Sequence, residues 1–213
     1  MKAHTKETQS SITPKLALEI LAEGNNRFVK NLKANRDLLA QVNDTRDGQW
    51  PLATILSCID SRTSAELVFD QGLGDIFSVR IAGNIVNVDI LGSMEFACKV
   101  AGSKLIVVLG HTKCGAVKGA CDHVEMGNLT ELLAKLQPAI DAEQETKEDR
   151  SSSNYHFVEN VATINVKQSV KNIMGRSPIL KQMVENGEIG IVGAMYNIET
   201  GKVEFYDDAS YIS

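Results

Sequence analysis

Blocks of apolar residues recur along the chain, and the spacing within each block predicts strands that alternate with helices. Three short, mostly apolar runs predict strands of a buried sheet: "PLATILSC" (51–58), "DIFSVRIAG" (75–83) and "SKLIVVLGH" (103–111). Apolar residues at helical spacing predict helices in the segments that separate and follow these strands, at 64–73, 87–102, 114–124, 129–142, 158–174 and 177–187.

The two ends of the chain complete the predicted fold. Thr13 as a cap and Pro14 at the first helical position predict a helix at 13–32, followed by a polar connector at 33–49. The segment 188–208 predicts two strands joined at "ETG", most simply a hairpin at the edge of the sheet. We therefore expect an α/β fold with a mainly parallel central sheet of about four parallel strands plus an antiparallel edge strand. Helices flank this sheet, and a helical arm precedes it.

The polar, serine-rich segment 143–156 predicts a surface loop, because no second pattern of strands follows it. The 213 residues suit a single domain at 1–213, with the arm at about 13–35 and the α/β core at about 50–213.

No apolar stretch reaches the roughly 18 residues of a membrane span, and the polar N-terminus lacks the apolar core of a secretion signal. The net charge of −5 argues against nucleic acid or an anionic membrane as partner. We expect a cytoplasmic protein.

Residues with metal-binding chemistry stand at two predicted strand ends. Cys58 ends the first strand and is followed at alternate positions by Asp60 and Arg62, while His111 ends the third strand and precedes Cys114 with H-x2-C spacing. In open parallel sheets, ligands gather at the carboxyl ends of strands. Two thiolates and an imidazole suit zinc, and three protein ligands leave one position open, as in catalytic sites.

Other interpretations of the same residues remain open at this point. A local structural site could use His111, Cys114, Cys121 and His123, or Cys58 could be a free nucleophile activated by Arg62 and a helix N-terminus. The clustering could also be coincidental, and Asp60 with Arg62 could be an ordinary surface ion pair. Alternatively, the arginine fork holds Asp60 ionised and oriented beside the metal. Cys98 fits the apolar stripe of a helix and is predicted to be buried.

The stretches "CIDSR", "GDIFSVRIAGNIV" and "GHTKCGAVKGA" resemble those of a beta-class carbonic anhydrase, and the resemblance covers most of the chain. It implies one Zn²⁺ per chain, bound by Cys58, His111 and Cys114. It further implies that Asp60 and Arg62 govern whether the site is open, with Asp60 as the fourth ligand in a closed state. The implied activity is the reversible hydration of carbon dioxide to bicarbonate and a proton through a zinc-bound hydroxide.

The resemblance also implies an assembly and a substrate pocket. The implied assembly is a homodimer in which the helical arm of each chain wraps the partner. In the family, such dimers often pair again into tetramers. Gln49 matches a glutamine that reaches the pocket from the neighbouring subunit. The implied wall of the pocket is formed by Phe77, Ala82, Gly83 and Phe96.

The chain departs from the family's pattern at three positions. Phe96 stands where a tyrosine is frequent, so the polar contact of that hydroxyl is missing. Ile81 replaces the usual asparagine. Ile55 replaces a tryptophan of some bicarbonate-regulated members, which weakens the case for their regulatory bicarbonate site.

Two alternative functions follow from the same scaffold. Relatives that hydrolyse carbonyl sulfide or carbon disulfide usually have Asp-Ala-Arg at the motif, whereas this chain has Asp60-Ser61-Arg62. A zinc-bound structural module without catalysis would need neither Asp60 nor Arg62.

Overall fold

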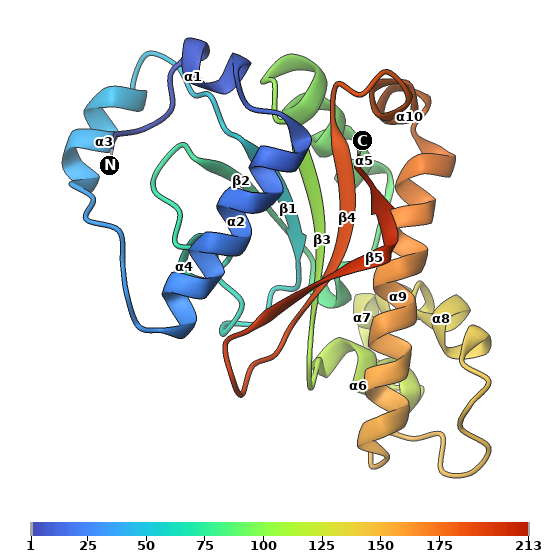
Figure 1. Ribbon diagram of the computed structural model, residues 1–213. Helices are drawn as coiled ribbons and strands as arrows, with labels where there is room; N and C mark the ends of the chain where they lie inside the picture. The colour runs from blue at the N-terminus through green and yellow to red at the C-terminus, as the bar shows by residue number, and fades with distance from the viewer. Residues whose placement is uncertain (1, 213) are drawn as a thin grey trace.

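The computed structural model describes residues 2–212 and contains a five-stranded sheet with the order β2-β1-β3-β4-β5 (Figure 1). The four strands from β2 to β4 are parallel, and β5 is antiparallel to β4, which confirms the predicted sheet with its terminal hairpin. The strands are β1 (Ala53–Ser57), β2 (Ile76–Arg80), β3 (Leu105–His111), β4 (Gly190–Tyr196) and β5 (Val203–Tyr211).

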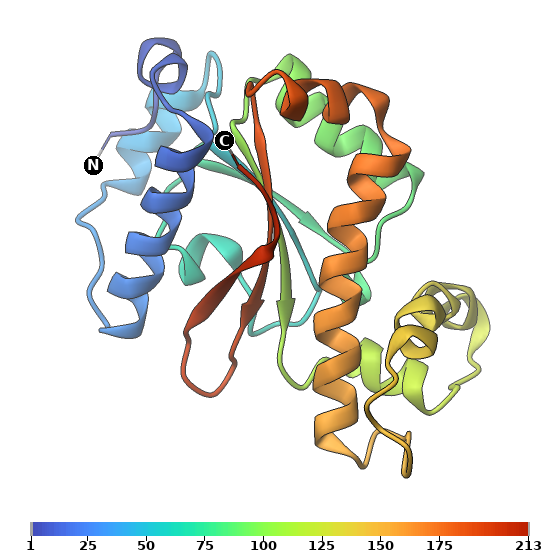
Figure 2. The same cartoon turned by 45° about the vertical axis from the view of Figure 1, so that its right-hand side comes forward.

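Helices cover both faces of this sheet, so β1, β3 and β4 are buried along their whole length (Figures 1 and 2). One face packs against α2 (Pro14–Val29) and α4 (Ala65–Val68). The other packs against α5 (Val88–Glu95) with the π-helical turn Phe96–Val100, and against α6 (Gly115–Cys121), α9 (Tyr155–Arg176) and α10 (Pro178–Glu185). Helix α7 (Gly127–Ala134) packs on α6, and α8 (Gln137–Ala142) packs on α9. None of the helices in residues 2–212 combines the length and apolarity that crossing a membrane requires.

Capping side chains explain where α2 begins and why two short helices formed that the apolar pattern did not predict. Thr13 accepts a hydrogen bond from the backbone N–H of Leu16 at 3.1 Å, with Pro14 in the first turn, as expected. Two further helices, α1 (Lys6–Ser10) and α3 (Leu38–Thr45), form in polar segments for which no helix was predicted. Asp37 caps α3 by accepting from the N–H of Ala40 at 2.9 Å, a signal that an apolar pattern does not carry.

Two predicted helices are shorter or divided. The helix expected at 64–73 forms only the single turn of α4. The segment 129–142 is divided into α7 and α8, because Pro138 lacks the N–H that a continuous helix would need and stands in the first turn of α8 instead.

The helix α2 is attached to the sheet of its own chain. Ala17 and Leu21 are fully buried in the core on that face. At Gly24 the helix approaches α4 so closely that an added Cβ would lie 1.8 Å from the carbonyl oxygen of Phe69. Contact of this segment with a partner subunit therefore remains a prediction.

This close approach predicts that Gly24→Ala destabilises the fold by about 3 kcal/mol, because backbone cannot move aside cheaply. Gly175→Ala is the matched control, since an added Cβ there meets nothing within 4 Å. It should raise the free energy of unfolding by about 0.5–1 kcal/mol through helix propensity. Urea denaturation measures both, and equal stability of the two variants would contradict the packing at Gly24.

Candidate metal centre

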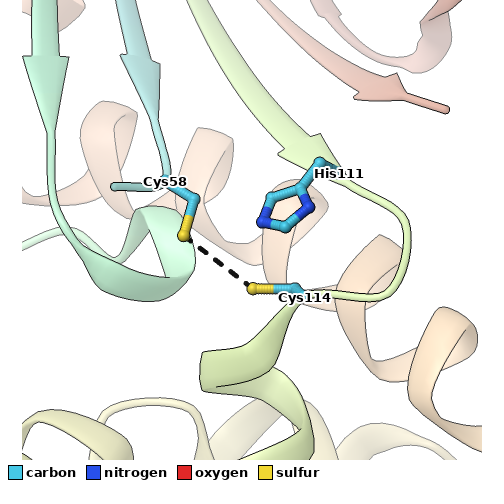
Figure 3. Close-up of side chains that lie close together, drawn as sticks. All are labelled: Cys58, His111 and Cys114. Carbon is cyan, nitrogen blue, oxygen red and sulfur yellow. Dashed lines mark hydrogen bonds between the residues drawn. The ribbon is translucent and has the colours of Figure 1, made fainter. Parts of the chain in front are cut away.

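The sheet topology brings the two predicted strand ends together. Cys58 directly follows β1, and His111 is the last residue of β3, the neighbouring parallel strand. Cys114 lies three residues further on, where it is the N-cap of α6. Figure 3 shows the three side chains pointing toward one another from these elements.

The distances between the three side chains fit a single metal ion. The Sγ atoms of Cys58 and Cys114 are 4.0 Å apart. All three donor atoms, including one ring nitrogen of His111, lie within 4.8 Å of one another, and all three residues are buried. Two thiolates bound tetrahedrally to zinc at about 2.3 Å would be about 3.8 Å apart. The two sulfur atoms are therefore within a few tenths of an ångström of the separation that zinc requires.

The imidazole of His111 is oriented to offer one free lone pair. Its Nδ1 is 2.9 Å from the carbonyl oxygen of Thr112, which can only accept, so Nδ1 carries the proton. Its Nε2 is buried and has no hydrogen-bond partner among the described residues. A buried acceptor without a partner is costly, and a metal ion on Nε2 would satisfy it.

The two thiols influence each other strongly. The hydrogen bond with Cys114 is the main cause that lowers the pKa of the Cys58 thiol to about 4, and the same bond raises the pKa of Cys114. The backbone N–H of Gly83 also donates to the Cys58 Sγ, at 3.4 Å. The pair thus holds one negative charge readily, and a cation is needed to stabilise the second.

Asp60 and Arg62 form a bidentate pair beside this cluster. The Arg62 Nε and backbone N–H both donate to Oδ1 of Asp60 at 2.9 Å, and Nη2 donates to Oδ2 at 2.7 Å. The hydrogen bond from Arg62 is the main reason that the pKa of the Asp60 carboxyl lies well below its usual range. Oδ2 of Asp60 is 3.9 Å from Nε2 of His111. An ionised acceptor, occupied by Arg62, therefore stands next to the three donors.

The predicted pocket residues fall into two separate places. The rings of Phe77 and Phe96 meet edge to face, with centroids 6.4 Å apart, in a groove of about 780 Å³ that Arg80 also lines. Ala82 and Gly83 form the turn after β2, and Gly83 contacts Cys58.

Gln49 is not in this groove. It lines another one, together with Val42 and Leu73. The single chain thus does not bring Gln49 to the groove of the two phenylalanines.

Two residues that hold the Cys58–Arg62 turn were missed by sequence reasoning. Arg80 donates from Nε to the Cys58 carbonyl oxygen at 3.0 Å and from Nη2 to the Asp60 carbonyl oxygen at 2.7 Å. The Thr63 hydroxyl donates to the Asp60 carbonyl oxygen at 2.9 Å. Arg80 stands inside the strand predicted at 75–83, and only the register in which it pairs with Ser57 brings it to the Cys58 turn.

The alternative local site of four ligands does not form. Cys58, His111 and Cys114 are the one cluster of three or more metal-binding side chains within residues 2–212. Burial raises the pKa of Cys121 to about 11 and that of Cys98 to about 12, so both are neutral thiols. Cys98 is 2% exposed, which confirms its predicted burial.

Known proteins of similar sequence are carbonic anhydrases. The family model described as "Carbonic anhydrase" matches residues 53–203. The chain is 34% identical over 203 residues to carbonic anhydrase 2 of Mycobacterium tuberculosis (strain H37Rv), covering 91% of this chain and 93% of that protein. It is also 34% identical over 198 residues to the carbonic anhydrase of Mycolicibacterium smegmatis, covering 90% and 92% of the two chains.

Solved structures agree with these sequence matches. The beta-carbonic anhydrase CcaA superposes with a TM-score of 0.70 at 25% identity, over 89% of this chain and 95% of that chain. CafA of Aspergillus fumigatus, a beta-carbonic anhydrase, superposes with a TM-score of 0.67 at 26% identity, over 78% and 80% of the two chains.

The donor cluster predicts one zinc ion per chain, since the described residues contain a single such cluster. Cys58→Ser and Cys114→Ser should lose stoichiometric zinc, because a serine hydroxyl does not supply the thiolate that zinc prefers. Cys98→Ser, at a buried cysteine outside the cluster, is the control and should retain it. Metal analysis by mass spectrometry of the purified proteins decides, and full zinc content in Cys58→Ser would rule out this centre.

Proposed function

The chain belongs to the beta-carbonic anhydrase family and is a carbonic anhydrase, and we propose that its reversible hydration of carbon dioxide depends on one Zn²⁺ held by Cys58, His111 and Cys114. One observation carries this proposal. Three buried donors from β1 and from the β3–α6 turn converge within 4.8 Å, and the Nε2 atom of His111 has no other partner among the described residues.

The ligands determine what the neighbouring residues must contribute. Zinc, when bound, supplies a Lewis acid that lowers the pKa of a coordinated water from about 15.7 toward about 7 in favourable sites. Cys58 and Cys114 together carry two negative charges, which offset the charge of the cation and make this site a weaker acidifier than three imidazoles would. Side chains beside the ligands therefore have to orient the attacking water.

Asp60 is placed to orient that water. Its carboxylate, ionised and 3.9 Å from the His111 Nε2, can accept a hydrogen bond from the attacking oxygen and aim a lone pair at the carbon of carbon dioxide. Arg62 supports this role because its fork occupies both carboxylate oxygens and disfavours binding of Asp60 to the metal. The closed state, with Asp60 as fourth ligand, requires these hydrogen bonds to break.

Carbon dioxide is apolar, and Phe77 and Phe96 give one groove of the chain an apolar part, although polar side chains such as Arg80 also line it. Phe77 and Phe96 supply two rings in contact, and Ala82 with Gly83 forms the turn between this groove and Cys58. We assign these residues to substrate binding and to the exclusion of bulk water. Because Phe96 has no hydroxyl, it contributes packing alone.

The position of Gln49 favours a homodimer. In the single chain, Gln49 lines a separate groove, so it can reach substrate only from a partner subunit. The described residues also leave β2 paired on one side only, and an unpaired edge strand is a natural site of association. Three exposed apolar side chains lie near this edge: Val88 in α5 is 72% exposed, and Phe96 and Val100 in the π-helical turn that follows are 52% and 71% exposed. Val88 and Phe96 line the same groove as residues of β2. Pairing of such dimers into tetramers stays a prediction.

The remaining proposals concern surroundings and alternatives. We propose a cytoplasmic location, because two thiols 4.0 Å apart need a reducing environment to stay available as ligands.

Carbonyl sulfide or carbon disulfide hydrolysis is not favoured, since the matching relatives of known activity are carbonic anhydrases. A structural module without catalysis is not favoured either, because it gives no role to the Asp60–Arg62 pair.

The catalytic proposal predicts that the purified protein hydrates carbon dioxide and that Asp60→Asn lowers kcat/KM by about 100-fold with zinc content unchanged. Arg62→Ala should also lose activity. Arg62→Lys keeps the positive charge without the two-pronged hydrogen bonding of arginine, so its activity should lie between those of the parent and Arg62→Ala. Stopped-flow measurement with a pH indicator, over a range of pH, gives the rates. Unchanged rate and pH profile in Asp60→Asn would remove Asp60 from the mechanism.

The dimer proposal predicts complementation between two inactive variants. Gln49→Ala lacks the group that its partner needs, and Asp60→Asn lacks a group in its own site. A mixed dimer has one intact site, composed of Asp60 from the first variant and Gln49 from the second. Co-expression with two affinity tags should therefore restore activity that neither variant has alone, and a mixed dimer without activity would contradict a Gln49 supplied by the partner.

A further inference from the structure

The two halves of the zinc site come from separate parts of the chain and must be held at a fixed distance. Cys58 directly follows β1, whereas His111 ends β3 and Cys114 follows it just before α6. Ligand distances tolerate only about 0.2 Å of error. Between the halves, the sulfur atoms of Cys58 and Cys114 are 4.0 Å apart, and Oδ2 of Asp60 lies 3.9 Å from Nε2 of His111.

We propose that helix α9 braces the two halves and that Glu159 and Asn165, on this helix, are positioning residues of the zinc site. The proposal rests on the zinc site proposed above. Helix α9 runs along one face of the sheet beside β3 and β4 (Figure 2). The side chains of Glu159 and Asn165 contact the backbone on either side of the ligand cluster.

Glu159 holds the turn that carries His111 and Cys114. Lys113, between these two ligands, has a φ of 56°, a left-handed conformation that is unfavourable for lysine. Its backbone N–H donates to Oε1 of Glu159 at 2.8 Å. This hydrogen bond stabilises the conformation that turns Cys114 back toward His111.

Asn165 holds the segment that contacts the other thiol. Its side chain is buried at 5% exposure and donates from Nδ2 to the carbonyl oxygen of Gly83 at 2.9 Å. The N–H of Gly83 in turn donates to Sγ of Cys58 at 3.4 Å. Gly83 has a φ of 69°, so its position depends on such contacts more than on intrinsic backbone preference. Asn165 therefore orients the donor that faces the Cys58 sulfur.

Close packing prevents α9 from sliding along the sheet. Val166 packs on the sheet over two glycines, Gly110 of β3 and Gly193 of β4, where an added Cβ would lie 2.6 Å and 2.9 Å from its side chain. Gly110 directly precedes His111 on β3. The helix is thus fixed against the strand that supplies His111, and a shift would disturb both polar contacts together.

These contacts differ from ordinary packing because each ends on backbone adjoining a ligand, while neither side chain touches a ligand side chain. Residues in this position around metal sites typically change metal affinity about 10–100-fold when removed. We expect Asn165→Leu, which keeps the volume and removes the donor, to weaken zinc binding in this range. Asn172→Leu, at an exposed position on the same helix, is the matched control and should bind zinc as the parent does.

The second pair of variants tests Glu159. Glu159→Ala removes the acceptor for the Lys113 N–H and should accelerate zinc release, whereas Glu159→Gln keeps an acceptor oxygen and should restore the parental rate. Glu159 is only partly buried, so this pair remains decisive even where Asn165→Leu does not fold. The rate at which zinc-loaded protein releases zinc to a chromogenic chelator is measured, together with the absorption bands of the cobalt-substituted protein, which report ligand geometry.

The outcomes separate the two proposals. The brace is supported if Glu159→Ala and Asn165→Leu release zinc faster than the parent protein and show shifted cobalt absorption bands, while the other variants behave as the parent does. Parental release and spectra in both of these variants overturn it, and so does a Glu159→Gln variant that behaves like Glu159→Ala. A parent protein that binds no stoichiometric zinc would instead overturn the zinc site itself.

Discussion

The structure depends on holding two cysteine sulfurs 4.0 Å apart in a buried place. Two thiolates at that distance repel each other in a medium of low dielectric constant. One sulfur therefore carries the charge while the other keeps its proton, and the hydrogen bond between them lowers the pKa of Cys58 and raises that of Cys114. A divalent cation removes the conflict, because it converts the repelling pair into ligands. The lone Nε2 of His111, buried at the same point, needs the same partner.

The sheet makes this arrangement possible at low conformational cost. Because β1 and β3 are parallel neighbours, their carboxyl ends lie side by side, and each ligand needs only the last residue of a strand or the turn after it. The strands are buried along their length, so their ends are rigid. Polar backbone contacts then hold the two turns: Arg80 fixes the turn after Cys58, and Glu159 fixes the turn before Cys114.

The reacting groups are arranged around this rigid centre by charge. Asp60 stands beside the three donors and is held by Arg62, which donates to both of its carboxylate oxygens. The Asp60 side chain is 15% exposed and that of Arg62 is 52% exposed, and the bidentate geometry is what distinguishes this pair from most surface ion pairs. The centre thus combines a fixed ligand set with one carboxylate whose partner decides how it acts.

The sequence by itself determined the order of strands and helices, the parallel sheet with its hairpin and the ligand candidates, because these follow from short-range periodicity and from motifs of a few residues. It did not determine α1 and α3, whose order comes from caps in polar segments, or the break at Pro138. The contacts of Arg80 and of Asn165 were decided only by the tertiary structure. Asn165 is 82 residues from Gly83, and no local pattern encodes a hydrogen bond whose partners meet only when a helix packs on the finished sheet.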